Sequence, residues 1–280
     1  MSEVTERRHI YHAEATALGG HLTLPLPHQV EFQAHTKLAE QGGYFSQRSE
    51  GYRLQSVLSF RSAYSHVAGN RNCKPHGGWH TLTTTVVEGL NVLEVLTADR
   101  VVGQTITEHP LDGHVPSISF LGTHFENLRI CGHRVELDMD YEIFGPRPAG
   151  DAPYTTDAGF VGRVKSQYDR IRQHKELPIE LKERYNQLSS TLGASEAAEC
   201  SLVNQAAGGY PGKTFGHVIT IPDFGTITLG KLTVKHEEPH EKTGAPKRTT
   251  FNLKMIELKL GCIIEGMIVI GGGTSNGTPG

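Results

Sequence analysis

Histidine is the residue with the greatest chemical potential in this sequence, because its imidazole binds metals and exchanges protons near neutral pH. The chain contains 16 histidines among 280 residues. Several occur in two stretches, around 73–80 and 108–124, and the second stretch also contains carboxylates. Loops that bring these groups to one end of a sheet would form a divalent-metal site or an acid–base pair. The candidate metal ligands are His76, His80, His109, His114 and His124.

These histidines support an alternative hypothesis, a histidine-based enzyme, with or without a metal, whose site lies in the two stretches. His124 and Glu126, two positions apart, would point to the same face of a strand. The individual spacings are nonspecific, and surface histidines without a function are the more common source of such a pattern. No serine or cysteine lies in a recognisable nucleophile motif. The leading interpretation therefore assigns no catalytic residue and no cofactor.

The segment His236-Glu237-Glu238-Pro239-His240 matches the zinc motif H-E-x-x-H. That motif works on a helix, where both histidines share one face. Pro239 would disrupt such a helix, and an alternating strand pattern comes directly before the segment. The sequence therefore predicts a solvated hairpin loop here.

The segment 207–214 resembles a phosphate-binding loop, with glycines followed by Lys213 and Thr214. A true P-loop opens a helix, whose N-terminus helps to hold the phosphates. Here a strand pattern follows over 215–222, and Pro211 removes one amide donor. We therefore expect a glycine-rich turn that re-enters a sheet.

The most regular stretch is 134–144. Successive side chains of a strand point to opposite faces, so this stretch predicts one dry face and one acidic face. The acidic row could bind calcium, but carboxylates two apart on one strand stand about 7 Å from each other. The favoured interpretation is a row that faces solvent, or that meets basic groups of the helical insert or of a neighbouring subunit. The dry face holds Val135, Leu137, Met139, Tyr141 and Ile143, and the acidic row holds Glu136, Asp138, Asp140 and Glu142.

Most of the remaining chain has the same strand-like alternation. Strands are expected within 19–25, 30–38, 52–60, 81–87, 92–107, 118–121, 125–131, 218–221, 226–235, 249–260 and 262–270. Gly103 is expected to mark a bulge, and Gly132-His133 a tight turn. The predicted fold class is mainly β, an antiparallel sandwich or barrel-like body formed by residues 1–145 and 210–270.

A helical hairpin is expected at 155–195, after a proline-rich linker. Phe160, Val164, Tyr168 and Ile171 recur at helical spacing, and a second apolar stripe follows Pro178. Short helices depend on burying such stripes, here against the body's own sheet or against another copy of the chain. The glycine-rich residues 271–280 are expected to form a mobile tail.

Composition excludes some classes of partner. The formal net charge is −3, which gives no electrostatic footprint for nucleic acid or an anionic membrane. No stretch approaches the ~18 apolar residues of a membrane span. The polar N-terminus lacks the apolar segment of a signal peptide, so a cytoplasmic location is expected. The cysteines are then free thiols: Cys73, Cys131, Cys200 and Cys262.

Two segments carry a resemblance to a family. Residues 122–135 contain Thr123, Phe125, Leu128, Gly132 and Val135 at the spacing small-x-F-x-x-L-x-x-x-G-x-x-V, which resembles a stretch of the bacterial choice-of-anchor P proteins. Residues 221–229 and 263–269 are similar to the closing strands of that family. The resemblance covers about a third of the chain and implies a β-rich fold. Members are mostly secreted proteins of unknown function, and the resemblance carries over no functional residue.

The leading functional hypothesis is a non-catalytic cytoplasmic structural or binding protein that associates with itself. It rests on the many strands, the amphipathic insert and the absence of a coherent active-site motif. A third hypothesis is binding of a glycan or another small ligand, with Trp79 and either Tyr44 or Tyr64 as stacking surfaces.

Overall fold

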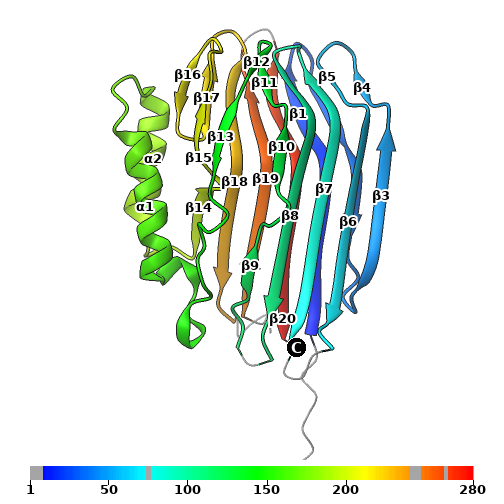
Figure 1. Ribbon diagram of the computed structural model, residues 1–280, viewed down its shortest axis with the longest axis vertical. Helices are drawn as coiled ribbons and strands as arrows, with labels where there is room; N and C mark the ends of the chain where they lie inside the picture. The colour runs from blue at the N-terminus through cyan, green and yellow to red at the C-terminus, as the bar shows by residue number, and fades with distance from the viewer. Residues whose placement is uncertain (1–8, 74–76, 112, 240–246, 262–263, 280) are drawn as a thin grey trace, which may run out of the picture.

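The computed structural model describes residues 9–73, 77–111, 113–239, 247–261 and 264–279. Two antiparallel sheets form the layers of a sandwich, and two helices stand at one side of it (Figure 1). The predicted fold class, a mainly β body with an inserted helical pair, is confirmed. Within the described residues, no helix is long and apolar enough to cross a membrane.

The first sheet has eight strands in the order β16-β17-β18-β19-β20-β1-β2, with β14 also paired to β18. It contains the first and the last strand, β1 and β20, side by side. Its strands are β1 (His9–Leu24), β2 (His28–Lys37), β14 (Ala197–Ser201), β16 (Lys213–Phe215), β17 (Val218–Ile221), β18 (Gly225–Glu237), β19 (Arg248–Leu260) and β20 (Glu265–Pro279).

The second sheet has ten strands built around the long hairpin of β7 and β8. Its strands are β3 (Gly43–Glu50), β4 (Arg53–Leu54), β5 (Leu58–Ser59), β6 (Ser62–Arg71), β7 (Trp79–Val92), β8 (Leu96–His109), β9 (Ser117–Ser119), β10 (His124–Glu126), β11 (Arg129–Ile130) and β12 (His133–Arg134). A separate pair is formed by β13 (Glu136–Met139) and β15 (Val203–Ala207). Two short 3-10 helices, η1 (Ala149–Asp151) and η2 (Tyr154–Thr156), precede the longer helices.

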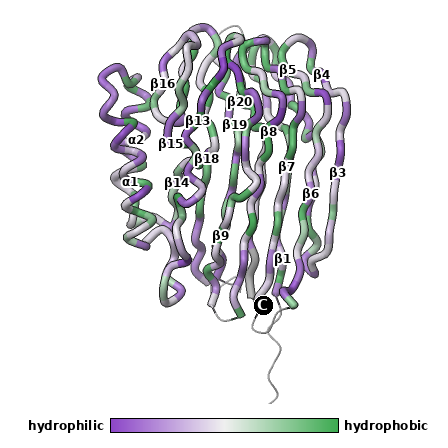
Figure 2. Tube along the Cα trace, viewed as in Figure 1, coloured by the Kyte–Doolittle hydropathy of each residue, from purple (hydrophilic) through white to green (hydrophobic). Residues whose placement is uncertain are grey.

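One part of the sandwich interior is apolar. Val87 and Val101 from the second sheet and Ile256 and Ile270 from the first are completely buried and belong to one apolar cluster. Burying one such aliphatic side chain contributes about 1.5–3 kcal/mol. These residues alternate with more polar ones along the long strands (Figure 2). Burial of the apolar side of each sheet therefore holds the two layers together.

Another part of the interior consists of small and polar residues. Thr107 Oγ1 of β8 lies 2.9 Å from Ser275 Oγ of β20. A Cβ placed on Gly273 would come within 3.0 Å of Thr83 Oγ1. The sequence interpretation of 271–280 as a mobile tail is wrong for 271–279, which pair with β1 on one side and β19 on the other. Glycine and serine are used here because the opposite layer approaches closely.

Buried histidines also lie in the interior. His109, at the end of β8, is 1% exposed, and its ring lies 4.9 Å from the ring of His9, which stacks on Trp79. His217 is 2% exposed, and its Nε2 lies 3.0 Å from Tyr185 Oη. Burial lowers the pKa of each to about 3, assisted at His109 by His9 and Arg147. Both imidazoles are therefore neutral in the folded protein at neutral pH.

The helical insert forms α1 (Ala158–Arg172) and α2 (Ile179–Thr191). Asp157 accepts a hydrogen bond from the Phe160 N–H at 2.8 Å and caps α1. The predicted apolar stripe of α1 is confirmed, because all four of its residues are buried. Phe160 stacks on Phe144 at 4.7 Å, and Phe144 contacts Phe251 of β19 at 5.4 Å. The insert therefore packs against its own sheet.

Two polar side chains of α1 bond directly to the backbone of β14. The Gln167 amide donates to Ser201 O at 2.9 Å and accepts from the Ser201 N–H at 2.9 Å. Tyr168 Oη donates to Glu199 O. The Ser201 N–H, the Ser201 C=O and the Glu199 C=O of β14 are thus hydrogen-bonded to a helix and not to another strand. This contact closes the sheet edge at β14.

Two predicted strand features differ from the structure. Residues 52–60 do not form one strand: β4 and β5 flank a turn in which Gln55 has a φ of 47°. Gly103 marks no bulge, because it lies in regular register opposite Thr85. Instead it leaves room for Met255, whose Cγ would be 2.8 Å from a Cβ at this position.

The segment that matches the zinc motif also differs from expectation. His236 was expected in a solvated loop, but it lies in β18, is 4% exposed, and its Nδ1 is 3.0 Å from Thr249 Oγ1. His240, the other histidine of the motif, lies outside the described residues. The strand continues further than expected because β19 pairs with it as far as Glu237.

Replacing Gln167 by Ala should destabilise the protein, because the Ser201 N–H and C=O would lose the Gln167 amide while Ser201 stays fully buried. Unsatisfied buried groups cost about 1–3 kcal/mol each, so we expect a loss of about 2–5 kcal/mol in the free energy of unfolding. Urea unfolding measures it. The matched control is Gln187→Ala at an exposed position of α2. Equal unfolding midpoints for the two variants would contradict this role of Gln167.

Acid should destabilise the fold through His109 and His217. Their folded pKa values lie below the unfolded value near 6.5, so at lower pH the unfolded chain takes up protons that the folded chain refuses. Each of the two histidines contributes its full stabilisation above pH 6.5. This stabilisation is lost as the pH falls from 6.5 towards 3, by about 1.4 kcal/mol per pH unit. His217→Gln should remove the contribution of one proton from this slope, measured by urea unfolding between pH 7.5 and pH 5. His28→Gln, at an exposed position, should keep the wild-type slope.

Candidate functional site

The histidines that the sequence offered as metal ligands lie in different environments in the structure. His80 Nε2 lies 3.6 Å from Glu108, and His124 Nε2 lies 3.0 Å from Glu126 Oε1. The prediction that His124 and Glu126 share a strand face is therefore confirmed. His109 is buried between the layers.

The other two candidate ligands are His114 and His76. The backbone N–H of His114 donates to Asp151 Oδ1 at 2.7 Å. His76 lies outside the described residues. Among the residues that are described, no group of three or more histidine, cysteine, aspartate or glutamate side chains is placed to hold a metal ion.

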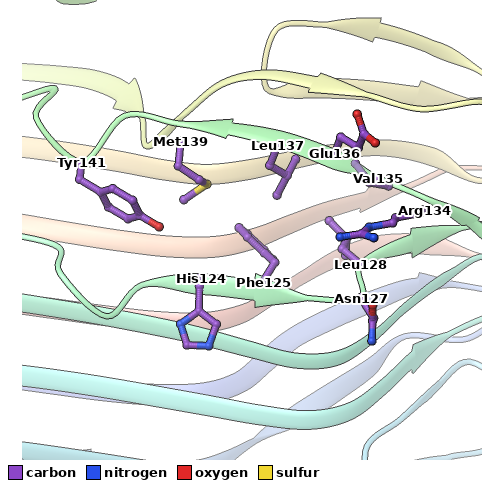
Figure 3. A pocket seen from close by; sticks show the side chains of 10 residues that line it. All are labelled: His124, Phe125, Asn127, Leu128, Arg134, Val135, Glu136, Leu137, Met139 and Tyr141. Atoms are coloured by element: carbon purple, nitrogen blue, oxygen red, sulfur yellow. The ribbon is translucent and has the colours of Figure 1, made fainter.

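A groove of about 400 Å³ lies between β10 and β13, on the side of the second sheet (Figure 3). Phe125 extends from β10 towards Leu137 and Met139 of β13, so the floor is apolar. Polar side chains complete the wall. The lining residues are His124, Phe125, Asn127, Leu128, Arg134, Val135, Glu136, Leu137, Met139 and Tyr141.

The groove is the opening of a hairpin whose two arms separate. Cys131 and Gly132 both have positive φ, 48° and 79°, and form a two-residue turn between β11 and β12. The turn was expected one residue later, at Gly132-His133. Beyond it, the arms are joined by a hydrogen bond from the Val135 N–H to Leu128 O at 2.9 Å.

After Val135 the arms diverge because they pair with different strands. The β10 arm follows β8, with Phe125 opposite Val101. The β13 arm follows β15, with Leu137 opposite Ala206. They meet again where Tyr141 Oη donates to Thr123 O at 2.7 Å. Each of the two strands has one hydrogen-bonded neighbour in the described sheets, so their facing edges are open.

The two-sided character of 134–144 is confirmed by the burial of its residues. Val135 and Ile143 are buried, Leu137, Met139 and Tyr141 are half-buried, and Glu136, Asp138 and Glu142 are exposed, whereas Asp140 of the acidic row is half-buried. The regular strand ends at Met139, earlier than predicted. Within the described part of the chain, no ion pair joins the acidic row to a basic side chain.

The stacking surface proposed from the sequence is only partly available. Trp79 is 6% exposed and lies against His9, so it cannot stack on a ligand at the surface. Tyr44 and Tyr64 do line one shallow hollow of about 390 Å³, together with His66 and Arg48. Tyr44 stacks on His66 at 5.8 Å.

A third hollow, of about 320 Å³, lies on the first sheet over Gly19, Gly20 and Gly272, beside the exposed ring of Phe32. It lies on β1, β2 and β20, away from the hairpin.

The groove was not predicted from the sequence, although the sequence did predict the apolar face of 134–144 that forms one of its walls. The dry face of 134–144 was expected to be covered completely by the body. The available signal was the turn at Cys131–Gly132, which makes 123–141 a hairpin. Nothing in the sequence indicates that β13 pairs with β15 in place of β10.

Comparison with known proteins gives one match. Residues 9–235 match a family described as a domain of unknown function, DUF8256. No curated protein and no solved structure matches the chain. The matched stretch is more than half of the chain and contains the helical insert and the whole groove. The resemblance to the choice-of-anchor P proteins stays a prediction. The chain belongs to the DUF8256 family.

Proposed function

We propose that this protein is a non-catalytic binding protein, and that the groove between β10 and β13 takes an extended segment of a polypeptide. The observation that carries the proposal is a groove with an apolar floor and polar walls, bordered by two strand edges that each lack a second strand. Open edges of this kind bind peptides by adding a strand, with main-chain hydrogen bonds for affinity and side-chain pockets for specificity.

The geometry limits the ligand to a short segment. The opening is closed at one end by the Val135–Leu128 hydrogen bond and at the other by the Tyr141–Thr123 hydrogen bond. Between them, the β13 arm runs from Glu136 to Asp140, which corresponds to about 17 Å of strand. A bound segment would therefore pair over about five residues.

Side chains of β13 define the chemistry of the ligand. A strand added beside β13 places alternate residues opposite Leu137 and Met139, and the others opposite Glu136 and Asp138. Apolar side chains suit the first set, and basic side chains suit the second. The acidic row has no ion pair within the described residues, so its charge is available to a partner. The proposed ligand alternates apolar and basic residues.

The absence of a catalytic role is part of the proposal, and the histidine-based enzyme is its competitor. His124 and Glu126 form an acid–base pair on the groove strand. Metal analysis of the purified protein separates the two hypotheses. Stoichiometric zinc, iron or manganese would favour the enzyme and would count against the binding protein.

A cytoplasmic location belongs to the same proposal. Cys73 and Cys131 are exposed free thiols, and Cys200 is a buried one. Exposed thiols persist in a reducing compartment and oxidise outside it, which supports a location in the cytoplasm.

A short blocked peptide of alternating valine and lysine should bind in the groove, and its valine–glutamate counterpart should bind at least about tenfold more weakly. Methyl NMR can locate binding, because the chain has 4 methionines in distinct places. The Met139 methyl signal, in the groove, should shift on titration. The Met267 signal, beside the glycine-lined hollow, should not shift.

The charge-reversed protein E136K/D138K should invert the preference between the two peptides. The matched control is E180K/E183K, which reverses two exposed carboxylates on α2 and should leave the preference unchanged. If neither peptide shifts the Met139 signal, or if both reversed proteins keep the wild-type preference, the proposed ligand chemistry is wrong.

A further inference from the structure

The edges of the two sheets differ in how they are protected. An edge strand presents unpaired N–H and C=O groups, which natural proteins shorten, bend or cover. Several edges here are short: β4 and β12 have two residues each, and β9 and β16 have three. The edge at β14 is covered by Gln167 and Tyr168 of α1.

The edge at β2 is bent. β2 is ten residues long, but Ala34 within it has a φ of 47°, and its register with β1 shifts between Leu18 and Gly20. Positive φ at a residue other than glycine breaks the regular row of groups that another strand would need. This edge is therefore protected by its irregularity.

The edge at β3 has none of these devices. All eight residues pair with β6 in unbroken register, from Gly43 with Gly69 to Glu50 with Ser62. Seven of the eight are exposed, and β3 has no hydrogen-bonded neighbour on its other side in the described sheets. It stands at the side of the sandwich opposite the helices (Figure 1).

We propose that β3 is the site of self-association, where a second copy of this chain adds its own β3 in antiparallel orientation around a two-fold axis at Gln47. This goes beyond the proposed groove function and does not depend on it. In this register, residues 44–50 of one copy pair with residues 50–44 of the other. The second sheets of both copies then join into one continuous sheet.

The charges on β3 favour a second copy over a charged partner. The strand is mostly hydrophilic (Figure 2), yet it carries one positive and one negative side chain, which pair with each other: Arg48 Nε lies 2.8 Å from Glu50 Oε1. The edge is therefore close to neutral and carries no lysine that would repel an identical strand. Across the axis, Arg48 would stand opposite Ser46, and Glu50 opposite Tyr44. No like charges are placed directly opposite each other.

Light scattering on the purified full chain should give the mass of a dimer. Gln47→Lys places two lysines opposite each other at the axis, and should weaken the dimer at least about tenfold. Gln187→Lys, the same substitution at an exposed position of α2, should leave the dimer unchanged. A wild-type protein that stays a monomer at high concentration would overturn the proposal. So would a dimer that Gln47→Lys leaves intact.

Cross-linking tests the register directly. Residues directly opposite in an antiparallel pair have Cβ atoms about 4.5–5.5 Å apart, close enough for a disulfide after small adjustments. In a protein with the exposed Cys73 and Cys131 replaced by serine, Gln47→Cys should form a covalent dimer under mild oxidation. Gln187→Cys should give no covalent dimer under the same conditions. Equal cross-linking of the two variants would exclude the axis at Gln47.

Discussion

The amide of Gln167 bonds to β14 as a neighbouring strand would, and the constraint behind that contact governs the whole molecule. A strand edge carries backbone groups that need partners, and a sandwich has such edges wherever a sheet ends. Gln167 and Tyr168 satisfy the groups of Ser201 and Glu199 from a helix. The helical pair is therefore an integral part of the sandwich. Its apolar stripe and its two polar side chains act together, since Phe160 fixes the helix over β19 while Gln167 closes β14.

The same constraint gives the groove its character. At Val135 the chain could have continued along β10, which would have closed the hairpin. It turns instead to β15, and the Asp140 N–H then bonds to Leu202 O at 2.7 Å. Two strand edges consequently face each other across side chains of Phe125, Leu137 and Met139. A groove made in this way differs from the hollow at Tyr44, because its walls offer main-chain groups as well as side chains.

Local sequence predicted many of the elements, although it missed β3 and β6, and it did not predict how the strands pair. The stripe from Phe160 to Ile171 specifies a helix with one buried face, and the alternation over 134–144 specifies a two-sided strand; both are local periodicities. The separation of β13 from β10 is a choice between a local hairpin pairing and the long-range pairing with β15. The burial of His236 also depends on a long-range pairing, that of β18 with β19. The mobile tail was predicted from glycine content. In the structure, Gly271 and Gly273 lie close to Thr85 and Thr83 of the second sheet, and the local sequence does not reveal this contact.

The histidine excess illustrates why residue type alone is weak evidence for chemistry. Imidazole is both a polar group and a flat ring, and this chain uses both properties in packing. His9 stacks on Trp79 inside the sandwich, and His217 lies against Tyr185 beneath α2. His80 and His124 instead lie near glutamates on strand surfaces. Because strands β7, β8 and β10 run through the sheet, they hold their histidines at fixed register, far from one shared loop. Among the described residues, no three or more of these side chains and the neighbouring carboxylates come together in a way that would hold a metal ion.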